Sequence, residues 1–115
     1  MRLNDQARFA LAVERANAYR EAGADCLFVP GLRDAETIGR IVGDVKCPVN
    51  ILAGPGSPTI PELQKLGVAR VSVGSAAMRA TLGLVRRIAE ELKTSGTYTT
   101  LENGITYADV NRMLA

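Results

Sequence analysis

The chain has 115 residues and a mass of 12.2 kDa, which limits it to one small domain. Hydrophobic residues make up 47% and charged residues 23%, which is typical of a folded domain and excludes a disordered one. No apolar run reaches the ~18 residues of a membrane helix, and the N-terminus lacks the apolar segment of a secretory signal. We therefore expect a cytoplasmic protein with no membrane association.

The charge balance and the residue types exclude several function classes. The net charge is +2, from 14 basic and 12 acidic residues, and aromatic residues make up 4%. Neither a concentrated basic face nor a supply of stacking rings is present, so we expect no nucleic-acid partner. The chain has no histidine, which excludes an imidazole base or metal ligand, and its two cysteines are too few for a disulfide scaffold.

The first half of the chain predicts a helix, a strand, a second helix and a second strand. The first helix runs from about Asn4 to Ala22, and the apolar run Cys26–Val29 after it predicts a buried strand. Asp34 is a good N-cap for the second helix. The second strand is Val49–Ala53. The apolar positions that define the two helical faces are Phe9, Ala12, Ala16 and Tyr19, and then Ile38, Ile41, Val42 and Val45.

The second half continues the alternation and then changes to helices. A capping box from Thr59 to Glu62 opens a third helix that ends at Gly67, and Val71–Val73 predicts a third strand. A polar stretch over residues 94–100 separates the fourth helix from a last helix that starts at Thr106. The fourth helix is predicted from apolar residues at helical spacing, namely Met78, Leu82, Val85, Ala89 and Leu92.

The spacing of the strands predicts the fold class. Successive strands begin 23 and 22 residues apart with a helix between them, which is typical of βαβ units with parallel strands. This repetition fits a TIM-type (β/α) barrel, but a full barrel takes about 250 residues. We therefore predict an α/β fold: a partial barrel of three parallel strands with flanking helices over residues 1–96, followed by a C-terminal helical tail over residues 97–115.

Glycine and serine residues follow the predicted strands, where (β/α) barrels place their ligand sites. Backbone amides in such loops can hold an anion, or the glycines can serve tight turns that need their conformational freedom. Asn50, within a strand, has the same two alternatives: it points at a substrate, or it satisfies a buried hydrogen bond. The candidate substrate- or anion-binding residues are Gly31, Asn50, Gly54, Gly56, Ser57, Gly74 and Ser75.

Four segments in order resemble the C-terminal part of the phosphoenolpyruvate mutase/isocitrate lyase superfamily. They are residues 14–25, 28–31, 50–56 and 66–74, and the similarity extends from about Asp5 to Leu114. The resemblance implies strands six to eight of a barrel. It also implies chemistry on C–C or C–P bonds next to an α-oxo acid, with magnesium stabilising an enolate. Among these reactions we favour a C–C lyase that acts on a small α-oxo or hydroxy carboxylic acid.

The resemblance also implies what this chain lacks. In the superfamily the magnesium-binding carboxylates and the gating loop come from earlier strands, so we expect no catalytic residue, metal ligand or cofactor in this chain. Lyase-type relatives often carry Glu after the position of Pro30, where this chain has Gly31. The nearest carboxylate, Asp34, is also a helix cap. Whether the chain is an enzyme is therefore left open, and we expect it to be inactive alone.

Two further functions and a set of partners stay open. One function is a non-catalytic module or remnant that oligomerises, and the other is a half-barrel that binds phosphate or another anion. Three parallel strands leave two open edges and an uncovered face, so we expect a homo-oligomer or association with the missing half-barrel. We expect the barrel-facing side chains of that face among Leu27, Val29, Ile51, Val71 and Val73.

Overall fold

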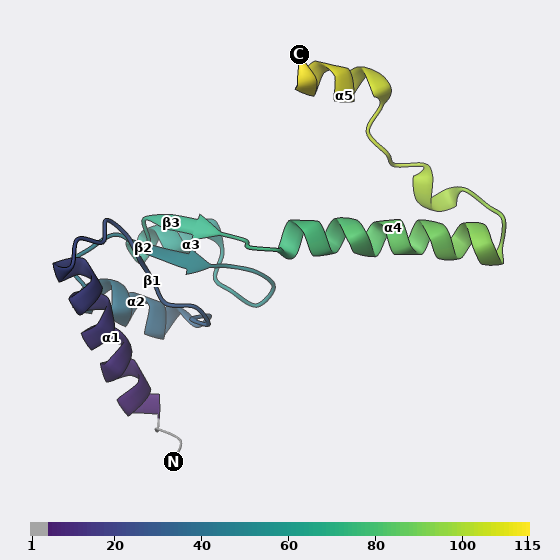
Figure 1. Cartoon of the computed structure of the whole chain (residues 1–115). Helices are drawn as coiled ribbons and strands as arrows, with labels where there is room; N and C mark the ends of the chain where they lie inside the picture. Colours follow the sequence, from purple (N-terminus) through teal and green to yellow (C-terminus); the bar gives the residue numbers. More distant parts are fainter. Residues whose placement is uncertain (1–4) are drawn as a thin grey trace. The chain divides into compact units, whose positions relative to one another are not determined.

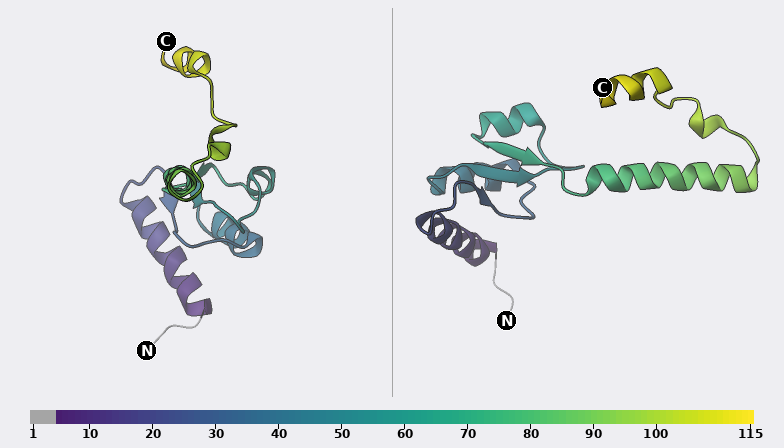
Figure 2. Two further views of the ribbon diagram at one scale, coloured as in Figure 1. Left: turned by 90° about the vertical axis from the view of Figure 1, so that its right-hand side faces the viewer. Right: turned by 45° about the horizontal axis from the view of Figure 1, so that its top comes forward.

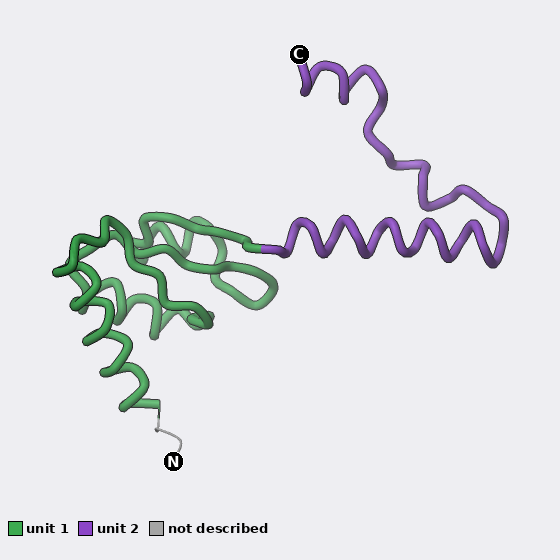
Figure 3. Tube along the Cα trace, in the orientation of Figure 1, with its two compact units in different colours: residues 1–74 green, residues 75–115 purple. Residues whose placement is uncertain are grey.

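A computed structural model describes residues 5–115 and divides the chain into two compact units, residues 1–74 and residues 75–115 (Figure 3). The first helix begins at Asp5, and the predicted start at Asn4 lies outside the described residues. Among the described residues, no helix is both long and apolar enough to cross a membrane. The boundary predicted between residues 96 and 97 stays a prediction.

Unit 1 is an α/β structure built on a three-stranded parallel sheet in the order β1-β2-β3 (Figure 1). A helix precedes each strand, as in the βαβ units that the strand spacing predicts. Figure 2 shows these three helices next to the sheet. The fold class is therefore confirmed. The elements of unit 1 are α1 (Asp5–Glu21), β1 (Leu27–Phe28), α2 (Ala35–Asp44), β2 (Val49–Leu52), α3 (Ile60–Lys65) and β3 (Arg70–Ser72).

The helices of unit 1 start where the sequence predicts, because side-chain oxygens accept hydrogen bonds at their N-termini. The Asp34 carboxylate accepts a hydrogen bond of 2.8 Å from the Thr37 backbone N–H, which lowers the pKa of Asp34. At α3 the Glu62 carboxylate accepts hydrogen bonds of 2.7 Å from both the hydroxyl and the backbone N–H of Thr59. Both predicted caps are confirmed.

The core of unit 1 lies on one face of the sheet. Leu27 pairs with Val49 across β1 and β2, and Ile51 pairs with Val71 across β2 and β3. Helices α1, α2 and α3 pack against this face, so its apolar side chains are removed from water. The buried residues of this cluster are Ala16, Leu27, Ile38, Ile41, Val45, Val49, Ile51 and Leu63.

The opposite face of the sheet is uncovered, and the expectation about its residues was wrong for Leu27 and Ile51. Both side chains are buried against the helices. Because successive side chains of a strand point to opposite faces, the uncovered face carries the alternate positions. There Phe28 is 48% exposed and Leu52 is 37% exposed. The apolar runs predict strands but do not fix which of the two alternating sets faces the helices.

Unit 2 contains α4 (Ala76–Thr94), a short 3-10 helix (Thr99–Leu101) and α5 (Tyr107–Leu114), with no buried side chain. The polar residues hold its turns locally. The Glu91 carboxylate accepts hydrogen bonds of 2.8 Å from the backbone N–H groups of Thr99 and Thr100 and one of 2.6 Å from the Thr97 hydroxyl.

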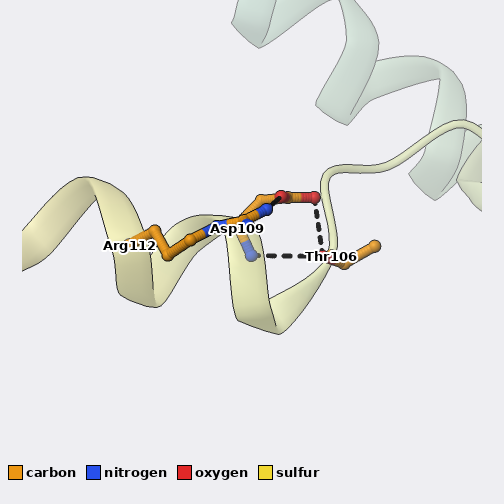
Figure 4. Close-up of polar contacts among 3 residues, drawn as sticks. All are labelled: Thr106, Asp109 and Arg112. Carbon is orange, nitrogen blue, oxygen red and sulfur yellow. Dashed lines mark hydrogen bonds and ion pairs between the residues drawn. The ribbon is translucent and has the colours of Figure 1, made fainter.

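The start of α5 is fixed by another local set of polar contacts (Figure 4). The Thr106 hydroxyl oxygen accepts a hydrogen bond of 3.1 Å from the Asp109 backbone N–H and donates one of 2.7 Å to the Asp109 carboxylate. Arg112 forms an ion pair with the same carboxylate. This confirms the predicted start of the last helix at Thr106. The same bonds lower the pKa of Asp109, and the largest cause is the hydrogen bond from the Thr106 hydroxyl.

Candidate functional site

The loop after β2 contains three of the seven candidate residues, Gly54, Gly56 and Ser57, and a fourth, Asn50, lies in β2 itself. Its hydrogen bonds close the loop on itself. The Ser57 backbone N–H donates to the Gly54 carbonyl at 2.9 Å, and the Gly54 N–H donates to the Ser57 hydroxyl at 3.2 Å. Gly56 has a φ of 86°, which favours glycine. The loop is thus a tight turn, and the Gly56 N–H and the Ser57 hydroxyl proton are its remaining donors.

An open pocket of about 520 Å³ lies beside this loop. It is built from the loop after β1, the loop after β2, and α3, which meet at the carboxyl edge of the parallel sheet. The structure thus brings Gly56 and Ser57 together with two cationic residues that the sequence analysis missed. The residues that define its polarity are Arg33, Asp34, Gly56, Ser57, Glu62 and Lys65.

The charges in this pocket are not equivalent. Asp34 and Glu62 cap α2 and α3, and hydrogen bonds from Thr37 and Thr59 lower the pKa values of both carboxyl groups. Arg33 and Lys65 form no ion pair within the described part of the chain. Arg33 instead donates a hydrogen bond of 3.4 Å to the Pro55 carbonyl, so its guanidinium lies against the loop. The positive charge is free to meet a ligand, whereas the negative charge already stabilises helix ends.

Gly31 lies in a different pocket from Gly56 and Ser57. This second pocket, of about 800 Å³, is formed by α1, α2 and the loop after β1. Gly31 has a φ of 92°, so the chain turns there through a conformation that favours glycine. The Arg40 guanidinium lies 4.0 Å from the centre of the Phe9 ring on one wall of this pocket. The structure therefore does not bring Gly31 into the same pocket as Gly56 and Ser57, although Asp34 lines both pockets.

Asn50 lies in β2, away from the strand ends, and both of its polar atoms have partners. Its amide Nδ2 donates a hydrogen bond of 3.1 Å to the Ser72 hydroxyl, and its Oδ1 accepts one of 3.1 Å from Arg70 Nε. Asn50 is 2% exposed. The structure shows the hydrogen bonds of a buried Asn50, and a ligand role for this residue stays a prediction.

Gly74 and Ser75 stand at the division between the two units. Gly74 has a φ of 53°, and a Cβ placed on it would lie 3.1 Å from Leu52 Cδ1. The left-handed conformation favours glycine here, and any larger residue would also push the Leu52 side chain aside. Ser75 is the N-cap of α4 and makes no capping hydrogen bond with its side chain. A ligand role for these two residues stays a prediction.

The described residues do not fit a divalent metal ion. Among residues 5–115, no group of three or more carboxylate or cysteine side chains lies close enough together to hold one, and histidine is absent from the sequence. Magnesium prefers carboxylate ligands in near-octahedral geometry, and the two carboxylates nearest the strand ends, Asp34 and Glu62, are committed to helix caps. No catalytic step of this chain is derived through a metal.

Comparisons with known proteins agree with this architecture. The chain is 42% identical over 80 residues to an uncharacterized protein of Mycobacterium tuberculosis H37Rv, which is 70% of this chain and 31% of that protein. It superposes with a TM-score of 0.85 and 41% identity on a provisionally assigned lyase/mutase of Burkholderia cenocepacia J2315, over 92% of this chain and 39% of that one. The chain thus spans less than two fifths of the length of either relative.

A third similar structure is that of an enzyme with a named activity. A 2,3-dimethylmalate lyase of the phosphoenolpyruvate mutase/isocitrate lyase superfamily shares the fold, with a TM-score of 0.72 at 24% identity over 92% of this chain and 39% of that one. The phosphoenolpyruvate phosphomutase family profile matches residues 1–93, which is most of the chain. The chain therefore belongs to the phosphoenolpyruvate phosphomutase family and has the fold of part of a superfamily barrel.

Proposed function

We propose that the chain is the C-terminal portion of a phosphoenolpyruvate mutase/isocitrate lyase-like enzyme, of the type that cleaves a C–C bond in a small α-oxo or hydroxy carboxylic acid. The family match and the likeness to superfamily barrels over 39% of their length support this proposal. The strand ends of this chain offer amide, hydroxyl and guanidinium groups and no free carboxylate. The chain alone then binds but does not catalyse, and the cytoplasm remains the expected compartment.

Within the chain, the main support for this proposal is the pocket beside the loop after β2. A carboxylate ligand needs hydrogen-bond donors and positive charge, and Arg33, Lys65 and the Ser57 hydroxyl line one space. In the proposed role, this pocket orients one carboxylate of the substrate, while the proton transfers and the metal belong to the rest of the enzyme. The first alternative, a half-barrel that binds phosphate, uses the same donors and differs only in the anion.

Binding and turnover by the purified chain test these assignments. We expect oxalate to bind weakly and with a preference over phosphate, and an Arg33→Met variant to lose at least half of the binding signal in an NMR titration. Lys46→Met, which removes an exposed cation outside the pocket, is the matched control. A preference for phosphate supports the anion-binding half-barrel instead. Equal shifts in both variants contradict a role for this pocket.

The second alternative, an oligomerising module, has its own support in α4. Four apolar side chains at helical spacing on α4 are 45–57% exposed, and an apolar helix stripe of this kind is normally covered by protein. We infer that a second copy of the chain covers this stripe, so that the assembled protein is a homo-oligomer. The residues of the stripe are Met78, Leu82, Val85 and Leu92. The catalytic and oligomeric proposals are compatible with each other.

A further inference from the structure

The uncovered face of the sheet carries a row of polar contacts at its centre. Phe28, Asn50 and Arg70 are register partners across β1, β2 and β3, so their side chains lie on the same face. Ser72 stands two residues after Arg70 and shares that face. The hydrogen bonds from Arg70 to Asn50 and from Asn50 to Ser72 therefore run across the sheet surface, on the side away from the helices.

Both polar side-chain atoms of Asn50 have a hydrogen-bond partner in this row, whereas only one nitrogen of the Arg70 guanidinium does. The Asn50 amide is used at both ends, one by Arg70 and the other by Ser72. Arg70 spends only its Nε–H on this contact. Neither of its Nη groups forms a hydrogen bond or ion pair with any residue from 5 to 115. The contact with Asn50 fixes the guanidinium on the sheet and leaves its outer edge free for a planar, bidentate acceptor.

Covering this face changes the energetics of Arg70. Parallel sheets are normally covered on both faces, and Phe28 and Leu52 expose apolar surface on this one. Any wall that buries those two side chains also removes Arg70 from water. A buried guanidinium without an anionic partner is strongly destabilising, and a carboxylate restores the balance through charge-assisted hydrogen bonds. A polypeptide that covers this face must therefore place a negative charge next to the guanidinium of Arg70.

We propose that the uncovered face is the docking surface for the remainder of the barrel, and that this remainder presents an Asp or Glu carboxylate to the guanidinium of Arg70. The proposal rests on the proposed function, since it takes the occupant to be the part of the enzyme that this chain does not span. β3 is an edge strand, and a parallel strand added to that edge places a side chain beside Arg70 on the same face. The ion pair between Arg70 and this carboxylate would lie at the start of β3. The pockets lined by the loops after β1 and β2 lie at the other end of the strands, so the ion pair would align the partner without touching a substrate.

The test is association with a defined partner. The probe is the part of the Burkholderia cenocepacia relative outside the segment that this chain matches, supplied as a separate polypeptide and also as a chimera in which this chain replaces the matched segment. We expect Arg70→Met to weaken the complex at least tenfold in a sedimentation titration and to lower the Tm of the chimera. Arg70→Lys should keep part of the affinity, because the charge remains while the bidentate geometry and the Nε–H contact with Asn50 are lost. Lys46→Met is the matched control and leaves both unchanged.

A chemical cross-link then identifies the carboxylate. In the Arg70→Lys variant, a carbodiimide joins the new amine to a carboxylate in contact, forming an amide as the carbodiimide takes up the elements of water to become a urea. We expect a peptide of the partner that contains Asp or Glu at the joined position.

The outcomes separate the inference from the function on which it rests. If the wild-type chain and the Arg70→Met variant bind the complementing polypeptide equally well, the inference is overturned and the proposed function remains. A cross-link to a second copy of this chain assigns the face to a homo-oligomer and overturns the inference too. If the two polypeptides form no complex and the chimera does not fold, the inference and the proposed function are both overturned.

Discussion

The two units of the chain are stabilised in different ways. Residues 1–74 place α1, α2 and α3 against one face of a parallel sheet and bury eight hydrophobic side chains there. Residues 75–115 bury none, and their turns are held by polar contacts such as those at Glu91 and Asp109 (Figures 3 and 4). Unit 1 thus has a core but an uncovered second face, whereas unit 2 has helices but no core.

The two units also differ in where they expose apolar surface. In unit 1 Phe28 and Leu52 are partly exposed on the face that we propose as a docking surface. In unit 2 the exposed apolar stripe of α4 is the surface that we propose a second copy covers. Hydrophobic burial is the dominant stabilising term in folding, so substitutions in the core of unit 1 should change stability, while those on the exposed stripe of α4 should change association.

The largest effect is expected in the core of unit 1. Ile51 is 0% exposed, and Ile51→Ala should lower the free energy of unfolding by about 2–5 kcal/mol, because it removes buried methyl groups and leaves a cavity. Leu82→Ala on α4 is the comparison, with an expected change within about 0.5 kcal/mol. Urea unfolding followed by circular dichroism measures both. Equal losses in the two variants would mean that unit 2 has a core of its own.

The next effect concerns association through α4. Leu82→Glu places a charge in the middle of the exposed stripe and should weaken self-association at least tenfold, since burying that charge is unfavourable. The helix itself should persist, because Glu is a good helix former. Analytical ultracentrifugation gives the association constant, and Lys93→Glu is the control on the same helix. A wild-type chain that stays monomeric at tens of micromolar contradicts the homo-oligomer.

A smaller effect is expected at the end of unit 1. Gly74→Val should cost about 1 kcal/mol or more, because valine is strained at a positive φ and its Cβ meets Leu52. Gly54→Ala in the preceding loop is the control, because Gly54 has no positive φ and a Cβ there meets nothing within 4 Å. Thermal unfolding of the two variants compares them directly. An unchanged Tm for Gly74→Val would show that this backbone conformation is not required.

The smallest effect is a local pH dependence in unit 2. Hydrogen bonds from the Thr100 and Thr97 side chains, with backbone N–H groups, lower the pKa of Glu91 from 4.5 to about 2. Because the folded state favours the ionised form, this contribution is complete above about pH 4.5 and is lost as the pH falls toward 2. The Thr99 and Thr100 amide shifts should titrate near pH 2 by NMR, and Glu91→Gln should abolish the transition. A midpoint near 4.5 would contradict this role of Glu91.

Much of the fold could be predicted from the sequence because its signals are local. Strand spacing, the Asp34 cap and the Thr59–Glu62 capping box each depend on residues within a few positions, and the structure confirms them. The strand face could not be predicted in this way. Leu27 and Ile51 were expected to face the barrel, but every position of a short apolar strand looks alike in sequence, so its phase is decided only by packing.

The candidate site was predicted less completely, for a related reason. Gly56 and Ser57 do line a pocket, but Arg33 and Lys65 come from other segments and meet them only in three dimensions. Parallel strands bring their carboxyl-end loops together, so Arg33 in the loop after β1 was an available signal. Lys65 is the last residue of α3 and had no such signal. For Arg70, the available signal was a cation directly before the predicted strand Val71–Val73.

The central claim is that this chain supplies part of an enzyme and does not catalyse alone. The direct measurement is turnover of an oxaloacetate-like or isocitrate-like acid with magnesium, by the purified chain and by the chain mixed with the complementing polypeptide from the Burkholderia cenocepacia relative. We expect no cleavage by the chain alone and cleavage by the mixture. The Arg70→Met variant should abolish cleavage by the mixture, because it prevents formation of the complex. Magnesium-dependent cleavage by the pure 115-residue chain would contradict it.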